Sequence, residues 1–391
     1  MKRYIDSKKK LYNAIMKLLW DSGEMREQNF LELFKNISYL HIEKDREEMP
    51  QFLITIKSIS DQHHRDANFI QSIEEILQHY KEQIKQTLSN DEIFHIFEDN
   101  KLLVLFLLKN GTISISESIY DYMVCKNESN GNRYCHFFYP ELSKFKGEEK
   151  MKSIKEELLS LNPTAFEEYE NKRQEGENDS YICSLIRNDS VEEFISYINR
   201  QNISVSSEIK PSIFETNLFL IENRNTTLIE YSAFFGSIRI FRYLMMNNVK
   251  LTPSLWIFSI HSKNSELFQL LESNKEIFSK EDFNYLPCFI ESIKCHHNDF
   301  SEYIKDNLIQ EQEIESTKIK EEILSNYIKY HNYAYFQTDD IKEQGFFYLC
   351  LYNYERLVEL LLTERKKEIE NKIILKDNIF INEELVSTIK I

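Results

Sequence analysis

Apolar residues recur along most of this chain at the spacing of an amphipathic helix. The segment 238–245 is typical, because its apolar residues fall at i, i+3, i+6 and i+7 and so share one helical face: Ile238, Phe241, Leu244 and Met245. The segment just before it has the same character, with Ile229, Ser232 and Ala233 on one side. The pattern therefore predicts two short helices in succession.

Gly236 stands between these two predicted helices. A glycine adopts the left-handed conformation that ends a helix without steric cost, so Gly236 is expected to close the first helix. Asn247 and Asn248 tolerate positive φ and are expected to close the second helix. One unit of the chain is then a helix, a tight turn, a second helix and a short loop.

The same unit recurs in the carboxyl-terminal half of the chain. Laid on residues 240–244, the apolar pattern of the second helix returns at four other places: 192–198, 267–271, 300–304 and 357–361. Neighbouring copies begin 27 residues apart, from 240 to 267, and 33 residues apart, from 267 to 300. A further degenerate copy is expected within 311–340. We expect these helix pairs to stack side by side around one continuous apolar seam.

The chain divides into three predicted parts. Residues 1–140 form an amino-terminal helical region, in which a degenerate repeat can begin as early as residue 90, because 103–114 echoes the ending of the second helix. The helices of residues 1–89 form either a bundle or a cap on the array. A charged helical linker follows at 141–178, and the repeat array occupies 179–391.

Composition supports an all-α chain. With seven glycines and six prolines in 391 residues, the sequence lacks the turns of a β-sandwich and the glycine loops of a nucleotide site. The formal net charge of −16 repels phosphate backbones and anionic lipid, so neither nucleic acid nor a membrane surface is an expected partner.

The sequence also favours an intracellular, cytoplasmic protein without membrane insertion. The first 20 residues lack the continuous apolar run of a signal peptide, and the most apolar segment, 102–108, is much shorter than the roughly 20 residues that cross a bilayer. Six cysteines are scattered without the spacing of a disulfide framework, as expected of reduced thiols.

The repeating unit resembles the ankyrin repeat, whose pattern is T-P-L-H-x-A-A-x-x-G followed by an apolar helix. Thr227, Ala233 and Gly236 match this pattern, whereas Leu228 and Glu230 replace its proline and histidine. More specifically, three segments look like the large ankyrin-like family of trichomonad protists, whose domain has no known function: 172–200, 229–244 and 252–266. The resemblance implies an ankyrin-type fold and protein binding, and it brings no catalytic residues.

Candidate catalytic and metal-binding residues do not form a recognisable site in the sequence. Cys295, His296 and His297 are consecutive, and consecutive helical residues point about 100° apart, so they cannot converge on one ion. Glu92 and His95 match the E-x-x-H of di-iron bundles, but that site needs a second copy of the motif. We therefore predict no enzyme, no catalytic residue, no metal and no cofactor.

Aromatic residues are the candidates for contact with a partner. By the resemblance, Phe234 and Phe235 occupy positions where ankyrin units carry variable, surface-facing side chains, and Trp256 opens the next inner helix. Burial of the Phe pair inside the stack is an equally good interpretation, because aromatic residues lie more often in a core than in a site. The predicted partner-binding residues are Phe234, Asn247, Asn248, Lys250 and Trp256.

The expected function is that of a non-catalytic scaffold or adaptor, which binds a protein of unknown identity with the surface of an ankyrin-like solenoid. Two alternatives remain open at this point. One is an enzyme or metal-dependent regulator of unrecognised type, and the other is a structural homo-oligomer.

Overall fold

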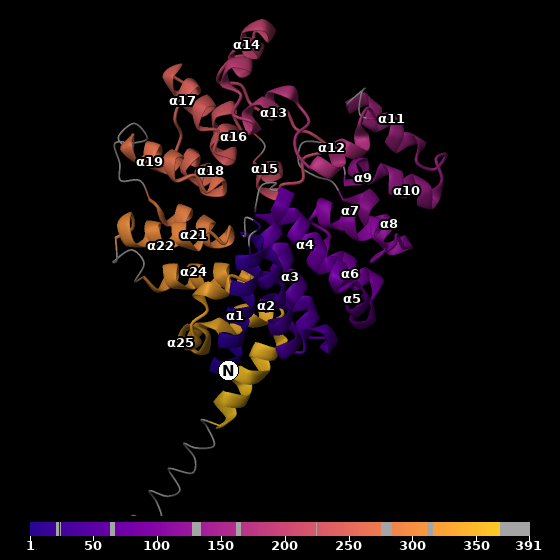
Figure 1. Ribbon diagram of the computed structural model, residues 1–391, viewed down its shortest axis with the longest axis vertical. Helices are drawn as coiled ribbons and strands as arrows, with labels where there is room; N and C mark the ends of the chain where they lie inside the picture. The colour runs from indigo at the N-terminus through magenta and orange to yellow at the C-terminus, as the bar shows by residue number, and fades with distance from the viewer. Residues whose placement is uncertain are drawn as a thin grey trace, which may run out of the picture.

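The chain is all-α. The computed structural model describes residues 1–20, Gly23, 25–62, 67–126, 134–161, 166–223, 225–274, 284–310 and 316–367, so the end of the predicted array, 368–391, lies outside the described residues. Every regular element in the described residues is helical, and their single β-type pairing is an isolated antiparallel bridge between Glu208 and Thr227 (Figure 1).

The amino-terminal half contributes short helices that pack against one another. Its elements are α1 (Lys2–Leu19), α2 (Arg26–Tyr39), η1 (Ile42–Lys44), α3 (Glu48–Asp61), α4 (Ala67–His79), α5 (Lys81–Thr87), α6 (Asn90–Phe97), α7 (Lys101–Lys109), α8 (Glu117–Cys125), α9 (Tyr134–Phe137), α10 (Tyr139–Lys146), α11 (Lys152–Leu161) and α12 (Tyr169–Glu175).

The carboxyl-terminal half continues with helices in pairs. Its elements are α13 (Tyr181–Arg187), α14 (Val191–Gln201), α15 (Leu218–Glu222), α16 (Leu228–Phe235), α17 (Ile238–Met246), α18 (Ser254–Ser262), α19 (Ser265–Ser273), α21 (Leu286–Lys294), α22 (Asn298–Asn307), α24 (Thr317–Lys329), η3 (Tyr333–Tyr335), α25 (Thr338–Asp340), η4 (Ile341–Gly345) and α26 (Phe346–Leu351). A last helical stretch runs over 355–367.

The first helices of these pairs lie side by side in chain order. Helix α13 packs on α16, α16 on α18, α18 on α21, α21 on α24, and α24 on α26. The second helices α14, α17, α19 and α22 follow their partners on the outer side, as the left-hand part of Figure 1 shows. The helix predicted over 238–245 corresponds to α17, in which Ile240, Phe241 and Leu244 are buried.

A turn that contains a residue in the left-handed conformation ends each of these first helices, α13, α16, α18, α21, α24 and α26. The residues with positive φ are Asp189, Gly236, Lys263, His296, His331 and Asn353. At Gly236 the next N–H, that of Ser237, donates to the Ser232 carbonyl oxygen at 2.9 Å, which is the hydrogen bond of a Schellman motif. The cap predicted at Gly236 is therefore confirmed. A Cβ atom on Gly236 would also lie 3.2 Å from the Cβ atoms of Ser262 and Asn264, so a side chain there would crowd the next pair of helices.

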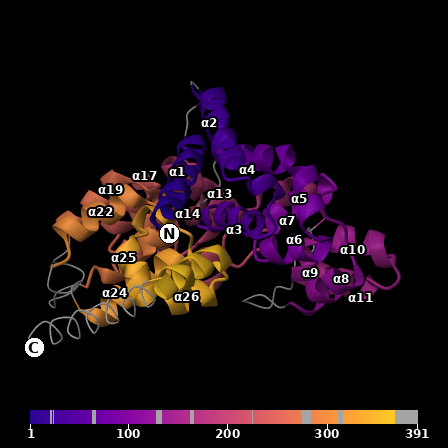
Figure 2. The same ribbon diagram turned by 90° about the horizontal axis from the view of Figure 1, so that it is seen from below.

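The amino-terminal helices α1 and α3 run along the edge of the stack formed by these turns. The Lys263 ammonium lies 4.1 Å from the centre of the Trp20 ring, just after α1. Three hydrogen bonds continue the contact at the next turns: Tyr12 Oη to His296 Nδ1 at 3.0 Å, Thr55 Oγ1 to His331 Nδ1 at 3.1 Å, and Gln51 Nε2 to the Asn353 carbonyl at 2.5 Å. In Figure 2, α1 and α2 lie between the carboxyl-terminal helices such as α19 and α22, on the left, and helices such as α5 and α8, on the right.

Candidate partner-binding groove

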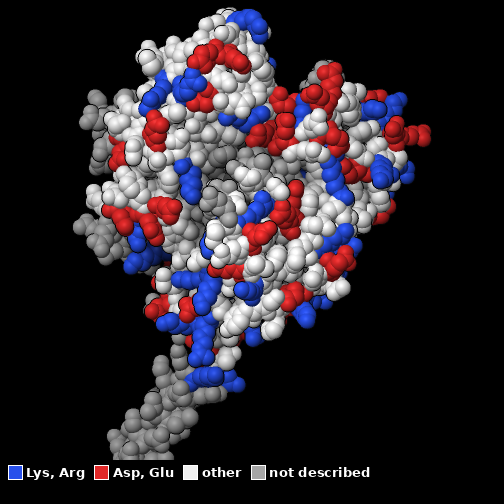
Figure 3. Space-filling view, in the orientation of Figure 1, with Lys and Arg blue, Asp and Glu red and all other residues white. Residues whose placement is uncertain are grey.

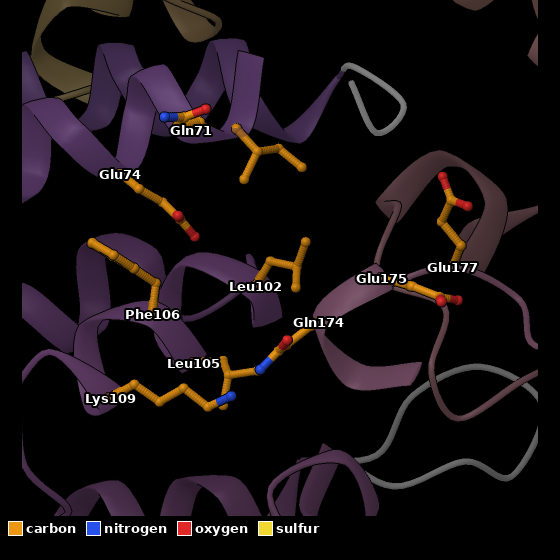
Figure 4. Close-up of a pocket in the computed structure, with 10 residues that line it drawn as sticks. Gln71, Glu74, Leu102, Leu105, Phe106, Lys109, Gln174, Glu175 and Glu177 are labelled. Carbon is orange, nitrogen blue, oxygen red and sulfur yellow. The ribbon is translucent and has the colours of Figure 1, made fainter. Parts of the chain in front are cut away.

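Helices α4, α7 and α12 enclose an open hollow of about 590 Å³ (Figure 4). Its floor is apolar and consists of Ile70, Leu102, Leu105 and Phe106. Its walls carry polar and charged side chains: Gln71, Glu74, Lys109, Gln174, Glu175 and Glu177. We call this hollow the α4–α7–α12 groove. Its floor and walls together offer apolar contact and negative charge in one place.

The composition of α7 explains the apolar floor. This helix reads KLLVLFLLK, so it is apolar on all sides and cannot hide every side chain in one direction. Most of its apolar side chains are buried, including Leu102 and Leu105 of the floor, whereas Phe106 is only partly buried. Asn100 caps the start of the helix, because its side chain accepts a hydrogen bond from the Leu103 N–H at 3.0 Å.

Gly176 sets the distance between α12 and α7. It ends α12 in the left-handed conformation with φ of +67°, and a Cβ atom there would lie 2.8 Å from Leu102 Cδ1 and 2.9 Å from Thr216 Oγ1. Arg173, fully buried within the segment predicted as a charged linker, anchors the same helix by donating to the Phe137 carbonyl at 3.0 Å and to Glu141 at 2.7 Å. These contacts hold α12, which forms one wall of the groove, in place against α7 and α10.

The carboxylates of the groove are incompletely neutralised. Glu74 reaches from α4 toward α7, and no hydrogen bond or ion pair joins it to another described residue (Figure 4). Burial raises the pKa of Glu74 above its ordinary value, against a smaller opposing effect of Lys109. The Lys109 ammonium binds Glu170 at 3.1 Å instead. Among the groove carboxylates only Glu177 has a close cation, Arg187 Nε at 2.6 Å.

Glu175 adds a second carboxylate without a cation. It is exposed on α12, on the other side of the groove from Glu74, and has no ion pair among the described residues. Figure 3 shows acidic side chains gathered over α12 and the start of α13. The groove has the chemistry to bind a cation whose aliphatic stem lies along Leu102 and Phe106.

The structure divides the predicted partner-binding residues into two groups. Asn247, Asn248 and Lys250 are exposed in the loop after α17 and remain candidates for partner contact. Phe234 and Trp256 are fully buried, so neither side chain is available at the surface.

Aromatic packing explains the burial of these two residues. The Phe234 ring stacks on His261 with centroids 5.0 Å apart, and Trp256 meets Phe268 and Tyr285 edge to face at 5.1 and 5.2 Å. Of the two interpretations of Phe234, core packing is the one that the structure supports.

Cys295, His296 and His297 diverge as the helical geometry requires. His296 faces Tyr12, and His297 Nδ1 donates to the Ile260 carbonyl at 2.8 Å. Cys295 instead meets His261 of the neighbouring α18 and Glu291 one turn earlier on α21. Sequence reasoning did not connect His261 with Cys295. Their separation of 34 residues, close to the 33-residue offset between neighbouring units, is the signal that would have placed them side by side.

Comparisons with protein-family models, with curated proteins and with solved structures find no match for this chain. The function must therefore be argued from the geometry of the chain itself. No helix in the described part of the chain is long and apolar enough to cross a bilayer.

Proposed function

We propose that this chain is a non-catalytic protein-binding scaffold built as an ankyrin-like solenoid. The serial packing of α13, α16, α18, α21, α24 and α26 supports the solenoid, because each pair of helices contacts its neighbours in chain order. In such an array the interior residues set the curvature while the loops and grooves are free to vary. That division suits recognition of a partner surface better than convergent catalysis.

The local structure at α16 supports the ankyrin-like form of the repeat. Thr227 Oγ1 accepts from the Glu230 N–H, and the Glu230 carboxylate accepts from the Thr227 N–H at 2.9 Å, a reciprocal capping box. Glu230 also accepts from Ser254 Oγ at 2.6 Å, so it ties the start of α16 to the start of α18. Glu230 thus secures the turn at the position where the ankyrin pattern has histidine.

The partner class that best fits the α4–α7–α12 groove is a basic segment with interspersed apolar side chains. The observation that carries this proposal is Glu74, a partly buried carboxylate that forms no ion pair with a described residue and lies above an apolar floor. A Lys or Arg side chain can lay its stem on that floor and bring its charge to Glu74 and Glu175. The net charge of −16 favours the approach of a basic partner over an acidic one.

Fluorescence anisotropy with two labelled peptides tests this proposal. The first peptide alternates Lys or Arg with Leu, and the second carries Glu in place of every basic residue. We expect the basic peptide to bind the wild-type chain and the double substitution Glu74→Gln with Glu175→Gln to weaken binding about tenfold, or about 1.4 kcal/mol. Added salt should also weaken binding, since the groove contacts are charged.

Glu321→Gln is the matched control, because Glu321 is an exposed carboxylate on α24, outside the groove. This variant should bind the basic peptide as tightly as the wild type. Equal affinity in the groove variant and in the control would reject the groove as the binding site. Failure of the wild type to prefer the basic over the acidic peptide would reject the partner class.

A further inference from the structure

Helix α26, the first helix of the last described pair, exposes two large apolar side chains. Phe347 is 66% exposed and Leu351 is 55% exposed, and their spacing of four residues places them on one helical face. We call these two residues the end face, because the described part of the chain contains no first helix after α26. A single exposed leucine is ordinary on a protein surface, whereas two large apolar side chains on one face need a reason.

The earlier units show that this position is normally covered. Phe347 lies six residues before Asn353, the left-handed residue of the turn that follows α26. In the five earlier first helices, the residue six positions before the left-handed one is buried or half-buried: Cys183, Glu230, Ile257, Ile290 and Ser325. Phe347 is therefore the exception, although its side chain is the largest of the six.

Helix α16 shows which neighbour covers the equivalent residues. Counted from Gly236, these residues are Glu230 and Phe234. Glu230 accepts from Ser254 Oγ at 2.6 Å, and the Phe234 ring stacks on His261 with centroids 5.0 Å apart. Both contacts lie on α18, the first helix of the next unit. The end face is thus the surface on which a further unit would pack.

Residues 368–391 lie outside the described part of the chain, but their sequence contains a further copy of the repeat. The segment 383–389, EELVSTI, corresponds to 192–198, EEFISYI, in α14. The two segments are identical at four of seven positions, and two more positions are apolar in both. Phe194 and Ile198 are the buried residues of α14, so the copy keeps apolar residues where α14 packs.

The further copy also falls at the expected distance along the chain. Leu385 and Ile389 stand at the two positions that are buried in α14. Ile389 follows Leu361, its counterpart in the preceding copy, by 28 residues, and earlier neighbouring copies are separated by 27 and 33 residues. The 24 residues after Lys367 are enough for a helix pair, since α18 and α19 together run from Ser254 to Ser273.

We propose that residues 368–391 are the last unit of the stack and dock on the end face. In this arrangement Ile379 meets Leu351, because it follows Leu351 by 28 residues, as His261 follows Phe234 by 27. The apolar side chains of the end face are then covered as those of α16 are covered by α18. The inference rests on the order of the helices in the stack and does not depend on the function of the α4–α7–α12 groove.

Disulfide cross-linking in the full-length chain tests the docking. The two exposed cysteines, Cys125 and Cys350, are replaced by serine, and Leu351→Cys is then combined with Ile379→Cys. We expect mild oxidation to join the two new cysteines within one chain, which mass spectrometry detects as a linked pair of peptides from the monomer. A disulfide that joins two chains would overturn the proposal and assign the end face to a second copy.

The matched control combines Tyr181→Cys with Ile379→Cys in the same background. Tyr181 is 51% exposed on α13, at the opposite end of the stack. The disulfide within one chain should form at least tenfold more in the Leu351 pair than in this control. Equal yields in the two pairs, or no disulfide in the Leu351 pair, overturn the proposal.

Hydrogen exchange without new cysteines gives a second measurement, which remains decisive if a cysteine variant fails to fold. Leu385→Asp with Ile389→Asp should make exchange in α26 about tenfold faster, because the end face loses its cover. Ser387→Asp is the matched control, since its counterpart in α14, Ser196, is exposed. It should leave exchange in α26 unchanged. Equal exchange in the two variants overturns the proposal.

Discussion

At the scale of single residues, two buried histidines affect the stability of the fold in acid. They are His296, in the turn after α21, and His331, in the turn after α24. The pKa values of His296 and His331 are lowered from about 6.5 to about 3, mainly by burial, and the nearby Lys8 and Lys57 ammonium groups contribute to the shift of His331. Between these two values the unfolded chain binds protons that the folded chain does not. The free energy of unfolding must therefore decrease as the pH falls below about 6.5.

Urea unfolding at pH 7.5 and 5.0 checks this prediction. Each of the two histidines should contribute about 2 kcal/mol to the loss of stability over that interval. His331→Gln should lower stability at pH 7.5 but reduce the loss between the two pH values. A pH dependence identical in His331→Gln and wild type would contradict the assignment.

At the scale of helices, two glycines separate the cost of backbone strain from the cost of crowding. Gly176 and Gly111 both end a helix with positive φ, +67° and +72°, so an alanine at either position costs about 1 kcal/mol or more in backbone energy. Only at Gly176 would the new methyl group also collide, with Leu102 and Thr216. Gly176→Ala should therefore be more destabilising than Gly111→Ala by roughly 1 to 3 kcal/mol.

Chemical denaturation of the two variants measures that difference. Since α12 forms a wall of the α4–α7–α12 groove, Gly176→Ala should also alter binding of the basic peptide. Equal destabilisation of the two variants would mean that α12 does not approach α7 as closely as described.

The sequence predicted the helices of the carboxyl-terminal half well because their signals are local. The apolar stripe of α17 and the cap at Gly236 each depend on residues a few positions apart. The left-handed turns at Lys263, His296 and His331 were not predicted, because these residues offer no local reason for positive φ. Their side chains contact Trp20, Tyr12 and Thr55, which are distant in sequence, and these contacts offset the strain.

The α4–α7–α12 groove could not be predicted from the sequence either, because it is formed by residues that are far apart along the chain. Glu74, Leu102 and Glu175 belong to three separate segments, and each alone is an ordinary helical residue. The amphipathic pattern shows that α4 and α7 exist, but it does not show which faces meet. Likewise, burial of Phe234 and Trp256 follows from neighbours in α15, α18, α19 and the start of α21, which periodicity within one unit does not reveal.

At the scale of the whole molecule, the amino-terminal helices and the carboxyl-terminal stack behave as one body. Tyr12 on α1 is fully buried and binds His296, which is 284 residues away in sequence. The buried Lys8 pairs with Glu48, and the amino group of Met1 lies 2.9 Å from Glu364 near the end of the described chain. These contacts couple the first helix to the last units of the stack.

This coupling predicts a distant effect of a local substitution. Tyr12→Ala leaves a cavity and removes the hydrogen bond to His296, at an expected cost of about 3 to 5 kcal/mol. Hydrogen exchange should then become faster in α21 as well as in α1, because the turn that ends α21 loses its support. Tyr39→Ala, at a ring that is 74% exposed on α2, should change neither. Faster exchange confined to α1 and α2 would show instead that the amino-terminal helices open independently, and that the stack holds its shape without them.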